Sequence, residues 1–122
     1  MPDDPRMLKI LRRLLERTEA REQEWTPSKN SDFRFLTDIA DWLVIVESED
    51  EDGSFPFRLS IHDQDNREID FLRSAPIPQN TPEDERRALR ARNIGIRELY
   101  EKARRSALKI DFALDSIEDL LA

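Results

Sequence analysis

Residues 81–108 read TPEDERRALRARNIGIRELYEKARRSAL and predict one long amphipathic helix, around which the rest of the chain is organised. Thr81 is a good N-cap, Pro82 suits the first helical position, and the acids at 83–85 match the positive end of the helix dipole. Apolar residues recur at spacings of three, four and seven, whereas arginines and lysines crowd the other side. The apolar positions are Leu89, Ile96, Leu99, Tyr100, Ala103 and Ala107. Because this apolar side has to be buried, a sheet or further helices must cover it.

The first part of the chain, residues 1–27, predicts a second amphipathic helix. Met7, Leu11 and Leu14 lie at helical spacing, which predicts a helix from about residue 5 to residue 23. Its polar side alternates arginine and glutamate, as is typical of a solvated helix face. Trp25 follows the expected end, and Pro27 excludes a continuation.

Residues 28–75 change the hydrophobic period from 3.6 to 2 and predict a sheet. The expected strands are residues 33–38, 42–46, 55–62 and 69–72. The second of them, WLVIV, is apolar on both faces and is expected to be the central strand. Turns are favoured at Gly53 and Asn66, and such short connections join antiparallel neighbours, so we expect a four-stranded antiparallel meander. The candidates for the side facing the helices are Phe33, Phe35, Trp42, Val44, Val46, Phe55, Phe57, Leu59 and Ile61. The pattern leaves open which parity of the central strand faces the helices.

A proline-rich crossover, residues 76–80, leads from the sheet to the helical part, residues 81–122. Gly95 costs ~1 kcal/mol relative to alanine inside a helix, which predicts a kink or a close backbone approach there. Residues 112–121 predict a short terminal helix with Asp111 as its cap. Because only a short break separates it from the long helix, we expect it to pack on the sheet face that is already covered. The expected fold is a single α+β domain with an N-terminal helix, a four-stranded antiparallel meander, a long C-terminal helix and a short terminal helix, the helices packing on one sheet face.

The net charge of −7 is distributed unevenly along the chain. Residues 81–110 carry nine basic and five acidic side chains, whereas residues 111–122 carry four acidic side chains and no basic one. The long helix is thus a basic element in an acidic protein, which can itself neutralise most of that charge. The chain has no cysteine, so disulfides are excluded. No apolar run approaches the ~20 residues of a membrane span, and the first residues do not read as a secretory signal, so we expect a cytoplasmic protein without a membrane segment.

Three segments resemble a family of small uncharacterised bacterial proteins. These segments are LLERTEAREQEW at 14–25, SIHDQDNREID at 60–70 and LYEKARRSALKIDFALDSIEDLL at 99–121. The tail of that family is similar to L-Y-E-L-A-R-R-S-A-L-G-V-D, a pattern from which Lys102 and Lys109 depart. The resemblance spans most of the chain and implies the order helix, β-meander, helix, and it implies no activity.

The residues that could carry chemistry do not form a recognisable catalytic or cofactor pattern. His62 is the only histidine, and its spacing of two strand positions from Ser60 lacks the geometry of a base that orients a nucleophile. The acidic turn 48–53 is similar to a calcium loop, but with Gly53 at the sixth position an EF-hand would need a bidentate glutamate where Leu59 stands. With two glycines in all, a glycine-rich phosphate loop is excluded. We therefore expect no enzyme activity, no metal and no cofactor.

The first functional hypothesis is a non-catalytic interaction module that binds itself or another protein. Its candidate interface is the sheet face that the helices leave open, with Leu36, Leu43, Ile45 and Leu72. An apolar patch of a few hundred Å² is more than monomers usually leave contiguous. We therefore expect a two-fold homodimer through this face or through the long helix.

The alternative hypothesis is a nucleic-acid-associated regulator that uses the arginines of the long helix. The candidate phosphate contacts are Arg86, Arg90, Arg97 and Arg104. The net charge of −7, and aromatic residues at alternating strand positions as in a core, both argue against nucleic-acid binding.

Overall fold

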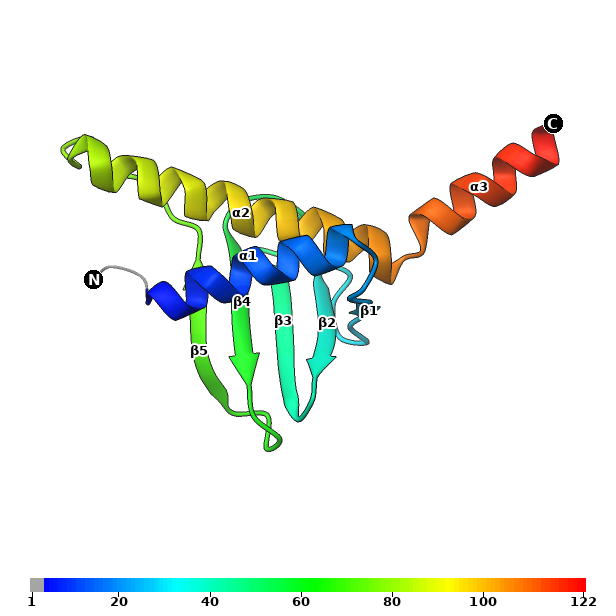
Figure 1. Cartoon of the computed structure of the whole chain (residues 1–122), viewed down its shortest axis with the longest axis horizontal. Helices are drawn as coiled ribbons and strands as arrows, with labels where there is room; N and C mark the ends of the chain where they lie inside the picture. Colours follow the sequence, from blue (N-terminus) through cyan, green and yellow to red (C-terminus); the bar gives the residue numbers. More distant parts are fainter. Residues whose placement is uncertain (1–3) are drawn as a thin grey trace.

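The computed structural model describes residues 4–122, which form three helices and five strands (Figure 1). In chain order they are α1 (Pro5–Glu19), β1 (Thr26–Pro27), β2 (Arg34–Ile39), β3 (Trp42–Ser48), β4 (Phe57–His62), β5 (Glu68–Arg73), α2 (Glu83–Ala107) and α3 (Ile110–Leu121). The predicted α+β class is therefore confirmed.

The sheet has five antiparallel strands in the order β1-β2-β3-β4-β5, one more than the four predicted. The extra strand is β1, in which Thr26 lies opposite Leu36 and Pro27 opposite Phe35. A two-residue strand is too short to show an alternating pattern, so the sequence predicts only that the first helix has ended before these residues. The other four strands form the expected meander.

Helices α1 and α2 cover one face of the sheet, and the core lies between these two layers (Figure 1). The parity of the central strand is now determined, because Val44 and Val46 are buried against the helices while Leu43 and Ile45 lie on the opposite face. Two residues predicted to face the helices are exposed instead. Trp42 opens β3 at a hairpin end, and Phe55 precedes β4, so neither lies beneath the helices.

The two long helices differ from their predicted bounds at one end each. α1 ends at Glu19, where Arg21 adopts a left-handed conformation (φ 61°) that stops the helix. This frees Gln23 to enter the core, where its amide nitrogen donates to the Thr37 hydroxyl at 2.5 Å. α2 begins at Glu83, and its N-cap is Pro82 rather than the predicted Thr81, without a side-chain capping bond.

Helix α2 is continuous through Gly95, where α1 packs closely against it. A Cβ atom placed on Gly95 would lie 3.0 Å from Leu11 Cδ2 and 3.6 Å from Leu11 Cγ. Of the two alternatives that the sequence left open, the close approach is thus the one that occurs.

We expect the substitution Gly95→Leu to lower the free energy of unfolding. Overpacking a filled core costs about 1–3 kcal/mol, whereas exchanging glycine for a good helix former returns less than ~1 kcal/mol. The matched control is Ala91→Leu, since Ala91 lies one turn before Gly95 in the same helix and is exposed. Urea denaturation measures both variants, and a Gly95→Leu midpoint at or above the wild-type value would contradict the close approach.

Helix α3 projects away from the two-layer body instead of packing on the sheet, so that part of the predicted fold is wrong (Figure 1). None of its residues is buried. Lys109 takes a left-handed conformation (φ 52°) and turns the chain out of α2, and α3 then begins at Ile110 without a side-chain cap from Asp111. The sheet face that α3 was expected to share is already covered by α1 and α2.

Candidate functional site

Three of the four predicted interface residues lie together on the face of the sheet that the helices do not cover, here called the open sheet face. Leu36 and Ile45 are cross-strand partners on β2 and β3, and Leu43 lies two residues before Ile45, each of them half-buried. Leu72 is a correction, because it lies opposite Leu59 in the helix-facing core and is only 1% exposed. The segment Ile69 to Leu72 carries apolar residues on both parities, so alternation alone could not select the face.

Ion pairs border the apolar residues of the open sheet face. Arg34 Nε lies 2.8 Å from Glu47 Oε2, and Arg58 Nη2 lies 2.7 Å from Glu68 Oε1. The Arg58 guanidinium also stacks on the Phe71 ring, 4.2 Å from its centroid. These contacts pair arginines of the open sheet face with its glutamates and place charged groups beside its apolar residues.

The four predicted phosphate contacts do not form one free row. Arg86 donates to the carbonyl oxygens of Pro78 (3.1 Å) and Gln79 (2.7 Å). Arg90 lies 3.8 Å from Glu83. The exposed side chains of Arg97 and Arg104 make no hydrogen bond or ion pair within the part of the chain that the structure describes. Only this second half of the row is available to a partner.

The residues considered for chemistry are occupied by local contacts. Ser60 Oγ and His62 Nε2 are 2.9 Å apart on β4, which is hydrogen-bond distance, so the prediction that two strand positions keep this pair out of such geometry is wrong. Ser60 is only 3% exposed. In the acidic turn, Asp52 Oδ1 accepts hydrogen bonds from Ser48 Oγ and from the Ser54 amide, and these two bonds close the loop. Among residues 4–122, no group of three or more histidine or acidic side chains is arranged to hold a metal ion, and no helix could span a membrane.

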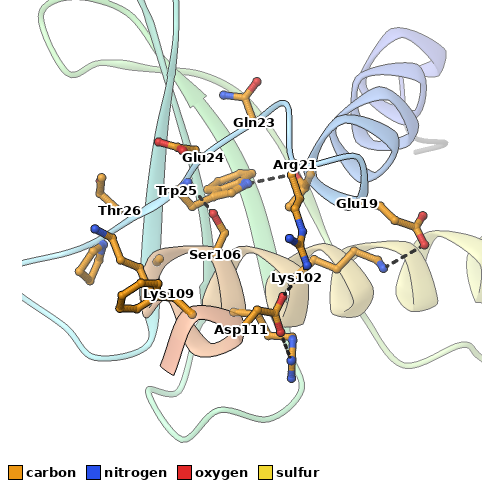
Figure 2. Close-up of a pocket in the computed structure, with 15 residues that line it drawn as sticks. Glu19, Arg21, Gln23, Glu24, Trp25, Thr26, Lys102, Ser106, Lys109 and Asp111 are labelled. Atoms are coloured by element: carbon orange, nitrogen blue, oxygen red, sulfur yellow. Dashed lines mark hydrogen bonds and ion pairs between the residues drawn. The ribbon is translucent and has the colours of Figure 1, made fainter. Parts of the chain in front are cut away.

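A groove of about 700 Å³ lies where the end of α1, strand β1 and the junction of α2 with α3 meet (Figure 2). Trp25 forms part of its wall, with its amide donating to Ser106 Oγ and its indole nitrogen to Thr18 Oγ1, both at 3.0 Å. Lys102 lies 3.6 Å from Glu19, and Asp111 is held by both Arg21 and Arg105. Because these charges pair with one another, the groove acts chiefly as the joint that sets the direction of α3.

A second groove, of about 650 Å³, lies between the end of α2 and the start of β2. Its floor is aromatic: the Tyr100 ring packs on Phe35 and Phe57, with centroids 5.4 and 4.8 Å away. Burial raises the pKa of the Tyr100 phenol, the Arg104 guanidinium opposes this rise, and the Asp52 carboxylate adds to it. The Tyr100 hydroxyl makes no hydrogen bond to any residue of the described chain, which leaves the groove with a polar atom at an apolar base.

An unpartnered apolar surface lies on α3. Its large apolar residues are between 53% and 84% exposed, namely Phe112, Leu114, Ile117, Leu120 and Leu121. Except for Phe112, which turns toward the first groove, they follow helical spacing and form one side, here called the apolar side of α3. The charged residues of α3 are all acidic. Glu118 flanks the apolar side next to Leu114 and Leu121, and Asp115 lies beside Glu118, further round the helix. The sequence showed these residues, but it did not show that nothing in residues 4–122 would cover them.

Comparisons of the chain with protein-family models, with curated proteins and with solved structures find no match.

Proposed function

We propose that this protein is a non-catalytic interaction module that binds another polypeptide through the apolar side of α3. The observation that carries the proposal is the exposure of that side, together with the absence of any buried residue in α3. Isolated helices shorter than ~12–15 residues are marginal in water, so a 12-residue helix without tertiary cover gains most of its stability when a partner covers it.

The mode of binding that α3 suits is a helix laid into an apolar groove, with anchors at helical spacing. Leu114, Ile117 and Leu121 follow the spacing i, i+3, i+7 that such helices present. A non-catalytic role agrees with the burial of Ser60, the hydroxyl beside His62, which is 3% exposed, and with the lack of a third group that orients the His62 ring among residues 4–122. Nucleic-acid binding has weaker support, since two of the four arginines are engaged within the protein and α3 adds a purely acidic neighbour.

The proposal predicts that Ile117→Ser combined with Leu121→Ser abolishes association without unfolding the body of the protein. The matched control is Leu43→Ser combined with Ile45→Ser, which removes the same kind of side chains from the open sheet face. Light scattering after size exclusion would measure self-association, affinity capture with the tagged full chain would measure other partners, and circular dichroism would check the fold. A wild-type chain that neither self-associates nor captures a protein would contradict the proposal, and so would association that only the control pair removes.

A further inference from the structure

Helices α2 and α3 carry opposite net charge, and within one chain the ion pair of Arg105 with Asp111 joins them only at their junction. All the charged residues of α3 are acidic, and only Asp111, in its first turn, reaches cations of the same chain, Arg21 and Arg105. The carboxylates of Asp115 and Glu118 form no ion pair within residues 4–122. Beyond its first turn α3 leads away from the body of the protein, of which α2 is a part (Figure 1).

A stripe along the solvent side of α2 carries exposed apolar residues and unpaired arginines, which are the groups that could bind the apolar and acidic residues of α3. It is defined by the residues Ile94, Arg97, Glu101, Arg104 and Leu108, spaced by three or four. The two apolar ends of this α2 stripe are each 46% exposed. They are 14 residues apart, about 21 Å along a helix, while the 12 residues of α3 span about 18 Å.

The α2 stripe also borders the second groove at one end. Leu108 and Arg104 line the second groove, whose floor includes Phe33 and Tyr100. A helix lying along the stripe can therefore place apolar side chains such as Leu114 and Leu121 toward the groove, while the acids on the flank of that side, Glu118 and Asp115, face the two free arginines. By contrast, the arginines of the open sheet face are already paired, so that face offers acidic residues no free cation.

We propose that the partner of α3 is a second copy of this chain, and that in a two-fold dimer each α3 lies along the α2 stripe of the other copy. This inference rests on the proposed function and names its partner. Asp115 and Glu118 then face Arg97 and Arg104, which gives unpaired charges of both signs a partner across the interface. A two-fold axis makes the contact reciprocal, so it forms twice and closes.

The reciprocal arrangement uses several surfaces of each copy. A standard interface buries ~800 Å² of each partner. Here each copy contributes the apolar side of α3, its α2 stripe and the mouth of the second groove.

Charge reversal tests this arrangement directly. One variant carries Arg97→Glu and Arg104→Glu, and the other carries Asp115→Arg and Glu118→Arg. Each variant alone faces like charges at both reciprocal contacts, and we expect its dimer dissociation constant to rise by about a hundredfold or more. A one-to-one mixture restores opposite charges at both contacts, so the mixture should form a heterodimer. Sedimentation velocity would measure all three samples, with circular dichroism to confirm that each variant is folded.

The outcomes separate this inference from the proposed function. A wild-type chain that is monomeric at concentrations on the order of 100 μM overturns the dimer, but capture of another protein that depends on Ile117 and Leu121 would leave the proposed function intact. A wild-type dimer that both reversed variants retain places the interface elsewhere and also overturns the inference. Two monomeric variants that do not combine on mixing do the same, since they show that Arg97 and Arg104 do not meet the acids of α3.

Discussion

Replacing Leu72 by aspartate should unfold the protein. Leu72 is 1% exposed and lies opposite Leu59 between the sheet and the helices. Loss of a buried leucine side chain costs about 2–5 kcal/mol, and an unpaired carboxylate in the same place adds a desolvation penalty of several kcal/mol. The sum is comparable with the whole free energy of unfolding of a domain of this size, about 5–15 kcal/mol.

The matched control for Leu72→Asp is Ile45→Asp on the other face of the same sheet. Ile45 is half-buried, and its cross-strand neighbours Leu36 and Ser60 carry no charge. We expect this variant to stay folded, with a loss of about 1–2 kcal/mol from the poor strand propensity of aspartate and from lost contacts. Far-ultraviolet circular dichroism and urea denaturation distinguish the two variants. If Leu72→Asp folds and Ile45→Asp does not, the assignment of the two faces is reversed.

Sequence periodicity located strands β3 and β5 but could not determine which face of each strand is buried against the helices. In β3 the valines and the leucine–isoleucine pair occupy opposite parities, and both are apolar, so the period could locate the strand but not orient it. In β5, Phe71 and Leu72 are both apolar, so alternation does not show which of them faces the helices. The β4–β5 pairing also has a register irregularity between Ile61 and His62, so the cross-strand partners in β5 cannot be found by counting residues from the turn. Burial against α1 and α2 decides the orientation in both strands, and that is a property of the packed structure and not of any one segment.

The class and the order of elements were predictable because each depends on local patterns. The 3.6 period of α1 and α2, the 2 period of the strands, and turn residues such as Gly53 and Asn66 act within a few residues. The direction of α3 was not predictable. It depends on a left-handed Lys109, a conformation that usually selects glycine, and on the contact of Asp111 with Arg21, far away in the sequence. The unpartnered apolar side of α3, on which the candidate site rests, follows from that direction.

Replacing Tyr100 by alanine should lower the free energy of unfolding by about 3–5 kcal/mol, because Tyr100 fills the space between α2 and the sheet. It is 3% exposed and packs on the rings of Phe35 and Phe57. Tyr100→Phe is the control, which keeps the ring and removes only the hydroxyl. Since the hydroxyl has no hydrogen bond within the described chain, this variant should differ from wild type by less than ~1 kcal/mol near neutral pH. Comparable losses in the two variants would show that the hydroxyl, rather than the ring, carries the stabilisation.

The same side chain should make the protein less stable at alkaline pH. Burial disfavours the charged phenolate, so the pKa of Tyr100 is raised in the folded protein above the ordinary value of about 10. Between the ordinary and the raised pKa the folded chain holds a proton that the unfolded chain has lost, so stability falls as pH rises through this interval, whereas below pH ~10 the contribution is fully present. Tyr100 is the only tyrosine, which allows the absorbance of the tyrosinate to report on it alone. We expect its titration midpoint in the native protein to lie above the midpoint in denaturant, and the loss of stability above pH ~10 to be smaller in Tyr100→Phe. A native midpoint equal to or below the denatured one would mean that the phenol is not shielded from water by Phe35 and Phe57.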